Sequence, residues 1–229
     1  MKRIAVLTAL LFAALQIGYA QKVGLVLSGG GAKGAAHIGV IKALEENGIP
    51  IDYITGTSAG AIVGSLYAMG YTPEEMVELM LSEEFSYWQT GTVENEYKYY
   101  FKRPDPTPEF GHFSIDMTDS LQVKASFLPQ SLINPIQMNQ AFMALFSQAT
   151  AKAGWNFDNL FVPFRCVASD IYSKKAIIFK NGDLGDAVRA SMTFPFFFQP
   201  IWKDSVPIFD GGIYDNFPVG RMKEAYQPD

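Results

Sequence analysis

Short apolar runs alternate with polar or glycine-rich connections along most of the chain. Such runs predict buried strands where they are short, and helices where the apolar residues recur at helical spacing. We expect strands at residues 23–27, 51–55, 164–168, 176–179 and 206–209. We expect helices at residues 35–44, 61–69, 183–191 and 219–226. This alternation predicts a single α/β domain.

Two further helices are predicted by their first residues. Thr72-Pro73-Glu74-Glu75 has the form of a capping box with proline at the first helical position, and it predicts a helix through Met80. Asn134-Pro135 opens the second helix, which should stop near Gly154. Its apolar face, which we interpret as core, consists of Met138, Ala141, Phe142, Leu145, Phe146 and Ala149.

The first twenty residues have the pattern of a secretory signal peptide. A basic head, Met1-Lys2-Arg3, precedes an apolar run from Ile4 to Ile17 and the small-x-small ending Gly18-Tyr19-Ala20. We expect cleavage after Ala20, so that the mature domain begins at Gln21 and the protein is exported to the periplasm, the outer membrane or the medium. The run is too short for a transmembrane helix.

Composition narrows the choice of partners. The 229 residues are 48% hydrophobic and 18% charged, enough for one sizeable core. Without residues 1–20, which include Lys2 and Arg3, 16 basic and 23 acidic residues remain, a net charge of −7. The absence of a basic run argues against nucleic acid, and the acidic balance argues against attraction to anionic lipid. The single cysteine, Cys166, is predicted to be a buried thiol.

Gly56-Thr57-Ser58-Ala59-Gly60 is the first candidate for chemistry. It reads G-x-S-x-G and lies between a predicted strand and a predicted helix. A serine on such a turn is exposed at a helix N-terminus, which favours the negative charge of a nucleophilic alkoxide. The alternative is an ordinary Gly-Ser turn.

A glycine cluster follows the strand at residues 23–27. Gly29, Gly30, Gly31, Ala32, Lys33 and Gly34 should expose backbone amides to an anion, either a phosphate or the oxyanion of an acyl-transfer intermediate. The spacing also satisfies the dinucleotide fingerprint G-x-G-x-x-G, but the next strand ends without the expected carboxylate. A P-loop is excluded because Ala35-Ala36 follows Gly34.

The chain has two histidines, and only His112, in a proline-rich aromatic segment, follows Ser58 as the order Ser, Asp, His of the α/β-hydrolases requires. We interpret both, His37 and His112, as structural. The better candidate for a general base is Asp210, which ends a predicted strand and precedes Gly211-Gly212. An Asp-Gly turn explains this placement equally well when it is considered alone.

Together, Gly29–Gly34, Gly56–Gly60 and Asp210-Gly211-Gly212 resemble the motifs of the patatin-like phospholipase family, and the resemblance covers about residues 22 to 229. It implies a three-layer α/β/α sandwich with a mostly parallel central sheet. It also implies a serine lipid acyl hydrolase that uses Ser58 as nucleophile, Asp210 as proton acceptor and Gly29–Gly34 as oxyanion loop. The substrate would be a lipid or another ester, without a cofactor or metal.

Two departures and two alternatives remain. Ser28 and Lys33 stand where many members have Asp and Arg, which could alter rate or substrate choice. The alternatives are a nucleotide-binding α/β enzyme and an inactive acyl-binding module of the cell envelope. Secreted bacterial members often continue into further domains, so we expect residues 21–229 to be truncated at their C-terminal end.

Residues 83–133 interrupt the α/β pattern. Tyr97, Tyr99 and Phe101 alternate with Lys98, Tyr100 and Lys102, which predicts an exposed strand. One interpretation is a flap that touches acyl chains or a membrane surface. The interpretation that we favour is an insertion whose aromatic residues pack on the main domain.

Overall fold

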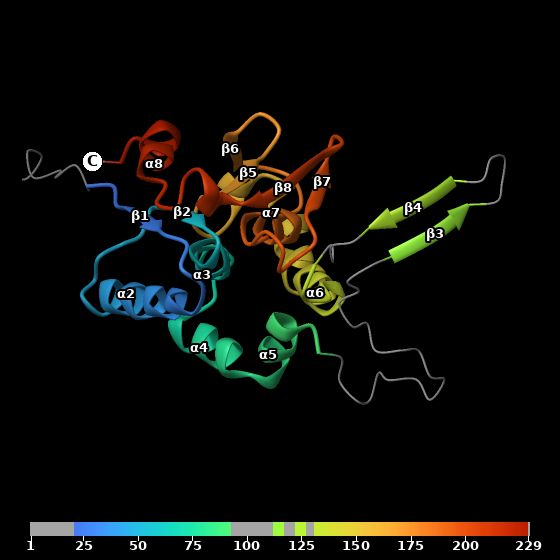
Figure 1. Cartoon of the computed structure of the whole chain (residues 1–229). Helices are drawn as coiled ribbons and strands as arrows, with labels where there is room; N and C mark the ends of the chain where they lie inside the picture. The colour runs from blue at the N-terminus through green and yellow to red at the C-terminus, as the bar shows by residue number, and fades with distance from the viewer. Residues whose placement is uncertain (1–20, 93–111, 117–121, 127–130, 229) are drawn as a thin grey trace, which may run out of the picture.

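A central sheet with helices on both faces forms the body of the molecule (Figure 1). The computed structural model describes residues 21–92, 112–116, 122–126 and 131–228. The predicted signal peptide and the predicted strand at residues 97–102 lie outside the described residues. The α/β class expected from the sequence is confirmed.

The sheet has six strands in the order β1-β2-β5-β8-β7, with β6 also paired to β5. β1, β2 and β5 run parallel, and β6, β8 and β7 add antiparallel pairs. The strands are β1 (Gly24–Leu27), β2 (Tyr53–Thr57), β5 (Phe164–Asp170), β6 (Lys175–Phe179), β7 (Ile201–Lys203) and β8 (Val206–Asp210).

Strand β5 brings two chain segments together end to end. Its residues 164–167 pair with β2, and its residues 168–170 pair with β8. Because β6 occupies the other edge of β5 along residues 166–170, β2 and β8 must share one edge. β2 is parallel to β5 and β8 is antiparallel, so their carboxyl ends meet: Thr57 pairs with Val167, and Asp210 pairs with Ala168. The residue after Thr57 therefore lies beside Asp210.

Seven α-helices of the described residues surround this sheet. They are α2 (Ala35–Glu46), α3 (Ala59–Ala68), α4 (Pro73–Leu81), α5 (Glu83–Thr90), α6 (Ile136–Lys152), α7 (Leu184–Ser191) and α8 (Val219–Tyr226). Successive side chains of a strand point to opposite faces. Ile54 of β2 packs against Gly64 of α3, whereas the next residue, Thr55, contacts Met222 of α8. Helices α3 and α8 therefore cover opposite faces of the sheet, as Figure 1 shows, which gives three layers.

The predicted helix starts and the predicted apolar stripe agree with the structure. The side chain of Thr72 accepts the N–H of Glu75, and the Glu75 carboxylate accepts the N–H of Thr72. In α6, Met138, Phe142 and Phe146 are buried in the main core. The predicted core interpretation of this stripe is confirmed.

The segment 83–133 contains elements that its sequence did not reveal. Helix α5 begins after Ser82, whose side chain accepts the N–H of Phe85, and ends at the left-handed Gly91. Its Trp88 packs edge-on against Phe142 of α6. A separate antiparallel hairpin follows, with β3 (His112–Asp116) and β4 (Gln122–Ser126). Helix α5 has few apolar residues, so its sequence shows little helical periodicity. Only the residues at its two ends could have predicted this helix.

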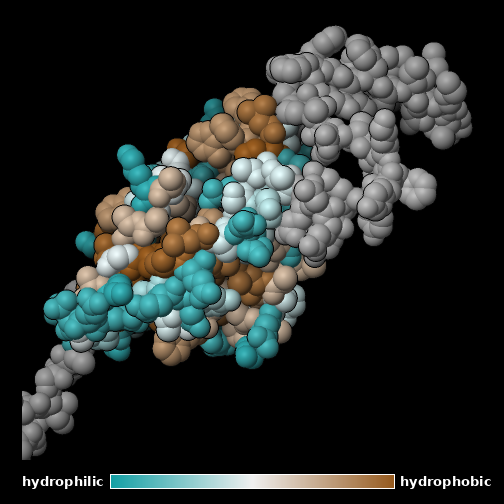
Figure 2. Space-filling view, turned by 90° about the horizontal axis from the view of Figure 1, so that it is seen from below, coloured by the Kyte–Doolittle hydropathy of each residue, from teal (hydrophilic) through white to brown (hydrophobic). Residues whose placement is uncertain are grey.

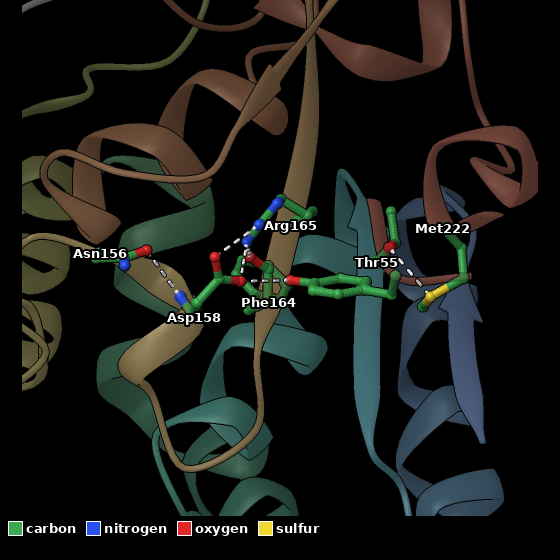
Figure 3. Close-up of polar contacts among 7 residues, drawn as sticks. Thr55, Asn156, Asp158, Phe164, Arg165 and Met222 are labelled. Atoms are coloured by element: carbon green, nitrogen blue, oxygen red, sulfur yellow. Dashed lines mark hydrogen bonds and ion pairs between the residues drawn. The ribbon is translucent and has the colours of Figure 1, made fainter. Parts of the chain in front are cut away.

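A polar cluster attaches α8 to the start of β5 (Figure 3). The buried guanidinium of Arg165 binds both carboxylate oxygens of Asp158, at 2.7 and 2.9 Å. The Tyr226 hydroxyl donates to Asp158 over 3.2 Å, and the Tyr226 ring lies between Arg165 and the stacked ring of Tyr53. Asp158 belongs to the short helix η3 (Phe157–Asn159), so the cluster joins η3, β5, β2 and α8.

The face that carries α4 and α5 is mixed in character. Figure 2 shows hydrophobic groups lying between hydrophilic side chains on this side of the molecule. Val77 and Leu81 of α4 are exposed hydrophobic residues. Within the described ranges, no helix is both long enough and apolar enough to cross a membrane.

Candidate active site

Ser58 occupies the sharp turn that joins β2 to α3. Its backbone has φ 53° and ψ −119°, a conformation that residues with a side chain rarely adopt. The flanking glycines permit this turn, because a Cβ at Gly56 would overlap the carbonyl of Gly60 and a Cβ at Gly60 would overlap the carbonyl of Leu27. The strand, turn and helix expected around G-x-S-x-G are therefore present.

The Ser58 hydroxyl donates a hydrogen bond to Oδ2 of Asp210 over 2.7 Å. The other carboxylate oxygen, Oδ1, accepts the N–H of Gly212 over 2.7 Å. Asp210 is 7% exposed, and burial raises the pKa of its carboxyl group, while the hydrogen bonds from Ser58 and Gly212 oppose that rise. The structure thus places a buried carboxylate with enhanced proton affinity directly on the hydroxyl of Ser58.

Gly211 lets the strand end close against β5. A Cβ at this position would overlap the carbonyl oxygen of Val167, the β5 residue that pairs with Thr57. Gly212 begins the turn whose amide holds Asp210, within the short helix η4 (Gly211–Ile213). Both glycines of the Asp-Gly-Gly motif therefore support the position of the carboxylate.

The glycine loop divides into two parts. Gly29, Gly30 and Gly31 line a cavity together with Ser58. The amide of Gly29 donates to the carbonyl of Asn216 over 3.1 Å, whereas the amides of Gly30 and Gly31 have no acceptor in the part of the chain that the structure describes. Gly31 has φ 55°, in the left-handed region that favours glycine.

Ala32, Lys33 and Gly34 lie in the second part of the loop, the short helix η1 (Gly31–Gly34). Ala32 and Lys33 are exposed to solvent and do not line the cavity. Gly34 is buried against Ala59, the first residue of α3, where a Cβ would be 2.5 Å from the Ala59 Cβ. This half of the loop therefore packs against the turn of Ser58.

The cavity has a volume of about 680 Å³ and two kinds of wall. One wall carries Ser58, Asp210, the glycines and Asn216. The other wall is apolar and consists of Met192, Phe194, Phe197, Phe198 and Ile213. An apolar wall beside a serine and a carboxylate suits a substrate with a hydrocarbon part and one polar, reacting group.

The apolar wall was not predicted from the sequence. The run Thr193-Phe194-Pro195-Phe196-Phe197-Phe198 carried a signal, because four phenylalanines and a proline between a helix and a strand are unusual. Asn216 was also missed. Its carbonyl accepts from Gly29, and its side chain lines the cavity, but no motif in a single sequence marks it.

The histidine predicted to be structural in α2 binds the backbone. The Nε2–H of His37 donates to the carbonyl of Ser28 over 2.9 Å, which ties α2 to the glycine loop. His112 belongs to the separate hairpin β3–β4. Asp52, at the start of β2, is paired with Lys22 and accepts the N–H of Val23. Neither His37 nor Asp52 lines the cavity of Ser58.

A model of the patatin-like phospholipase family matches residues 25–222. A lysophospholipase NTE1 of Pyricularia oryzae is 31% identical over 204 residues, which are 89% of this chain and 11% of the relative. A patatin-like phospholipase domain-containing protein of Caenorhabditis elegans, ZK370.4, is 29% identical over 203 residues, which are 88% of this chain and 12% of the relative. The chain thus spans about a tenth of the length of these relatives.

Among solved structures, VipD of Legionella pneumophila matches with a TM-score of 0.54 and 17% identity. The match covers 86% of this chain and 47% of VipD, and it supports the fold. The family match extends over most of the chain and includes Ser58, Asp210 and the glycine loop. The chain therefore belongs to the patatin-like phospholipase family.

Proposed function

We propose that the protein is a lipid acyl hydrolase that works with a Ser58–Asp210 dyad. The observation that carries this proposal is the 2.7 Å hydrogen bond from the Ser58 hydroxyl to the buried Asp210 carboxylate. Ser58 attacks the carbonyl carbon of an ester while Asp210 accepts the hydroxyl proton. The proton then passes to the leaving alcohol, and an acyl-enzyme remains on Ser58.

Hydrolysis of the acyl-enzyme repeats the same steps with water. Asp210 accepts a proton from water, the hydroxide adds to the acyl carbon, and the free acid leaves as Ser58 recovers its proton. Both tetrahedral intermediates carry an oxyanion. The amides of Gly30 and Gly31 are the donors that we assign to it, since they line the cavity without another acceptor in the described residues.

The lipid nature of the substrate is supported by the apolar wall and by the relatives. Phe194 and Phe197 line the cavity and are about half exposed. Phe196 lies between them in the sequence, and Phe217 follows the cavity residue Asn216. Several relatives are named lysophospholipases, a name that describes an enzyme acting on lipids. We therefore propose that acyl chains contact this aromatic rim, and that the rim also touches the lipid surface from which the substrate comes.

Labelling with a fluorescent organophosphonate tests the proposal without knowledge of the substrate. The native protein should be labelled, and Ser58→Ala should lose both labelling and ester hydrolysis. Ser65→Ala is a matched control, because Ser65 is a buried serine of α3 whose hydroxyl donates to the carbonyl of Ile62. Labelling of Ser58→Ala at the native rate would contradict the assignment of the nucleophile.

We also propose export, on the sequence of residues 1–20 alone. The basic head, the apolar run and the Gly18-Tyr19-Ala20 ending support cleavage after Ala20. N-terminal sequencing of the protein from an expressing cell tests this. A mature chain that starts at Gln21 is expected, and retention of Met1 would contradict export by this route.

A further inference from the structure

A short segment at the end of α7 contacts the backbones of both dyad residues. The N–H of Ser58 donates to the hydroxyl oxygen of Ser191 over 2.9 Å. The N–H of Asp210 donates to the carbonyl oxygen of Thr193 over 2.8 Å. The segment 191–193 therefore holds the main chain of the nucleophile and that of the base at the same time.

The direction of the hydrogen bonds at Ser191 is defined. Its hydroxyl donates to the carbonyl of Val167 over 2.6 Å, so a lone pair of the same oxygen faces the N–H of Ser58. Ser191 is fully buried. Val167 pairs with Thr57 at the point where β2 and β8 meet. Ser191 thus ties the turn of Ser58 to the strand that fixes the position of Asp210.

The strained turn at Ser58 needs a contact that holds its backbone in place. A residue with a side chain at φ 53° is strained, and it keeps that conformation only where its surroundings hold it. The amide of Ser58 is the group that Ser191 holds, and its orientation decides where the Ser58 side chain points. The 2.7 Å contact with Asp210 depends on that direction.

Thr193 is itself fixed by a buried cation. Nη1 of Arg189 donates to the Thr193 hydroxyl over 2.7 Å, and the same hydroxyl donates to the carbonyl of Arg189 over 2.7 Å. Arg189 also donates to Asn139 and to the carbonyl of Gln199. The segment that carries Ser191 is therefore anchored from α6, from α7 and from the loop before β7.

We infer that Ser191 is a positioning residue for ester hydrolysis, which holds the Ser58 amide so that the Ser58 hydroxyl meets Asp210. The inference rests on the proposed function of this site. Ser191 does not line the cavity, so it acts on the geometry of Ser58 and not on substrate binding. A misplacement of about 1 Å in a catalytic group can cost about 100-fold in rate. Loss of the Ser191 hydroxyl should therefore lower kcat and leave KM nearly unchanged.

Ser191→Ala, Ser191→Thr and Ser169→Ala form the test. Ser169 is a matched control because it is a fully buried serine of β5 whose hydroxyl has no partner in the described part of the chain. The rates of organophosphonate labelling, kcat and KM on a soluble p-nitrophenyl ester, and thermal melting are measured for each variant. Ser191→Ala should label about 10- to 100-fold more slowly with KM within about threefold. Ser191→Thr, which keeps the hydroxyl, should recover most of the rate, and Ser169→Ala should label like the native protein.

The outcomes separate this inference from the proposed function. A native protein that is not labelled at all contradicts the proposed function. A native protein that is labelled, together with folded Ser191→Ala labelled at the same rate, overturns the positioning role alone. Should Ser191→Ala be unfolded at the assay temperature, Ser191→Cys decides. Its sulfur is a weak acceptor, so the same slow labelling is expected, and a native rate overturns the inference.

Discussion

At the scale of single residues, the site combines a strained serine with a buried carboxylate. The sequence alone could suggest both, since G-x-S-x-G marks Ser58 and a strand end before two glycines marks Asp210. It could not supply Ser191, Thr193 or Asn216, because each acts through backbone contacts that only the folded chain creates. Neither could it divide the glycine loop into its cavity-lining and packing halves.

Replacement of the carboxylate should separate activity from stability. In Asp210→Asn the neutral amide no longer accepts the Ser58 proton, so hydrolysis should fall about as far as in Ser58→Ala. Burial opposes the charge of Asp210, so removal of that charge should leave the melting temperature at pH 7 equal to or above the native value. An activity assay on a soluble ester tests the expected loss of hydrolysis, and melting curves test the expected melting temperature. An active Asp210→Asn, or one that melts well below the native protein, would count against this account of the site.

The raised pKa of Asp210 also predicts the pH dependence. The proposed base must be ionised, so kcat/KM should fall toward acid with an inflection above about 3.9, the ordinary value of an aspartate. The effect on stability has the opposite sign. Because the pKa is raised on folding, the contribution of Asp210 to stability is largest below its unfolded pKa and is lost as pH rises through the folded pKa.

A pH–rate profile, with circular dichroism at each pH, distinguishes loss of the base from unfolding. His37→Ala should show the same acid inflection, since His37 bonds to the carbonyl of Ser28 and lies outside the cavity. An inflection that disappears in folded His37→Ala would point to a histidine as the base.

At the scale of elements, β5 is the partner on which the site is assembled. Its strand-like sequence was evident, and so were the strands at 23–27 and 206–209. The antiparallel direction of β8 was not, because an apolar run has the same appearance in either direction. That direction makes the end of β8 meet the end of β2. Side-chain pattern therefore predicted which segments form strands, and tertiary packing decided how they meet.

Two glycine-to-alanine substitutions test the junction. In Gly211→Ala the new Cβ would overlap the carbonyl of Val167, so β8 must move away from β5 and carry Asp210 with it. We expect a loss of about 1–3 kcal/mol in the free energy of unfolding and a fall in labelling. Gly220→Ala is the control, since no other side chain of the described residues lies within 4 Å of its Cβ position in α8. It should be stabilised by about 0.5–1 kcal/mol with native activity. Equal unfolding curves for the two variants would contradict this account of the junction.

At the scale of the whole molecule, the site lies at one end of the sheet and the Arg165–Asp158–Tyr226 cluster lies at the other. Ser58 follows the carboxyl end of β2, whereas Tyr53 begins that strand and stacks on Tyr226. The cluster joins the last described helix to η3, β2 and β5. The α8 helix itself was predicted from the sequence, but its attachment depends on residues more than fifty positions away in the chain.

Asp158→Asn tests whether this attachment supports the fold without serving the chemistry. It leaves the guanidinium of Arg165, which is 7% exposed, without its carboxylate. Asp158 is itself partly exposed, so we expect a loss of about 1–2 kcal/mol, below the 3–5 kcal/mol of a fully buried pair. Arg165 lowers the pKa of Asp158, so this stability is present above the unfolded pKa and is lost as pH falls through the folded pKa.

The decisive comparison is between melting temperature and labelling rate. Asp158→Asn should melt several degrees lower at pH 7, lose part of the native sensitivity to acid, and label with organophosphonate at the native rate at 25 °C. Glu74→Gln, which breaks the exposed ion pair with Lys42, is the control and should melt like the native protein. Since the cluster binds the start of β5 and the site uses its middle, a folded Asp158→Asn that labels slowly would show that the two ends of the sheet are coupled. Unchanged melting would show that α8 is held by its apolar contacts, with Met222 buried against β1 and β2.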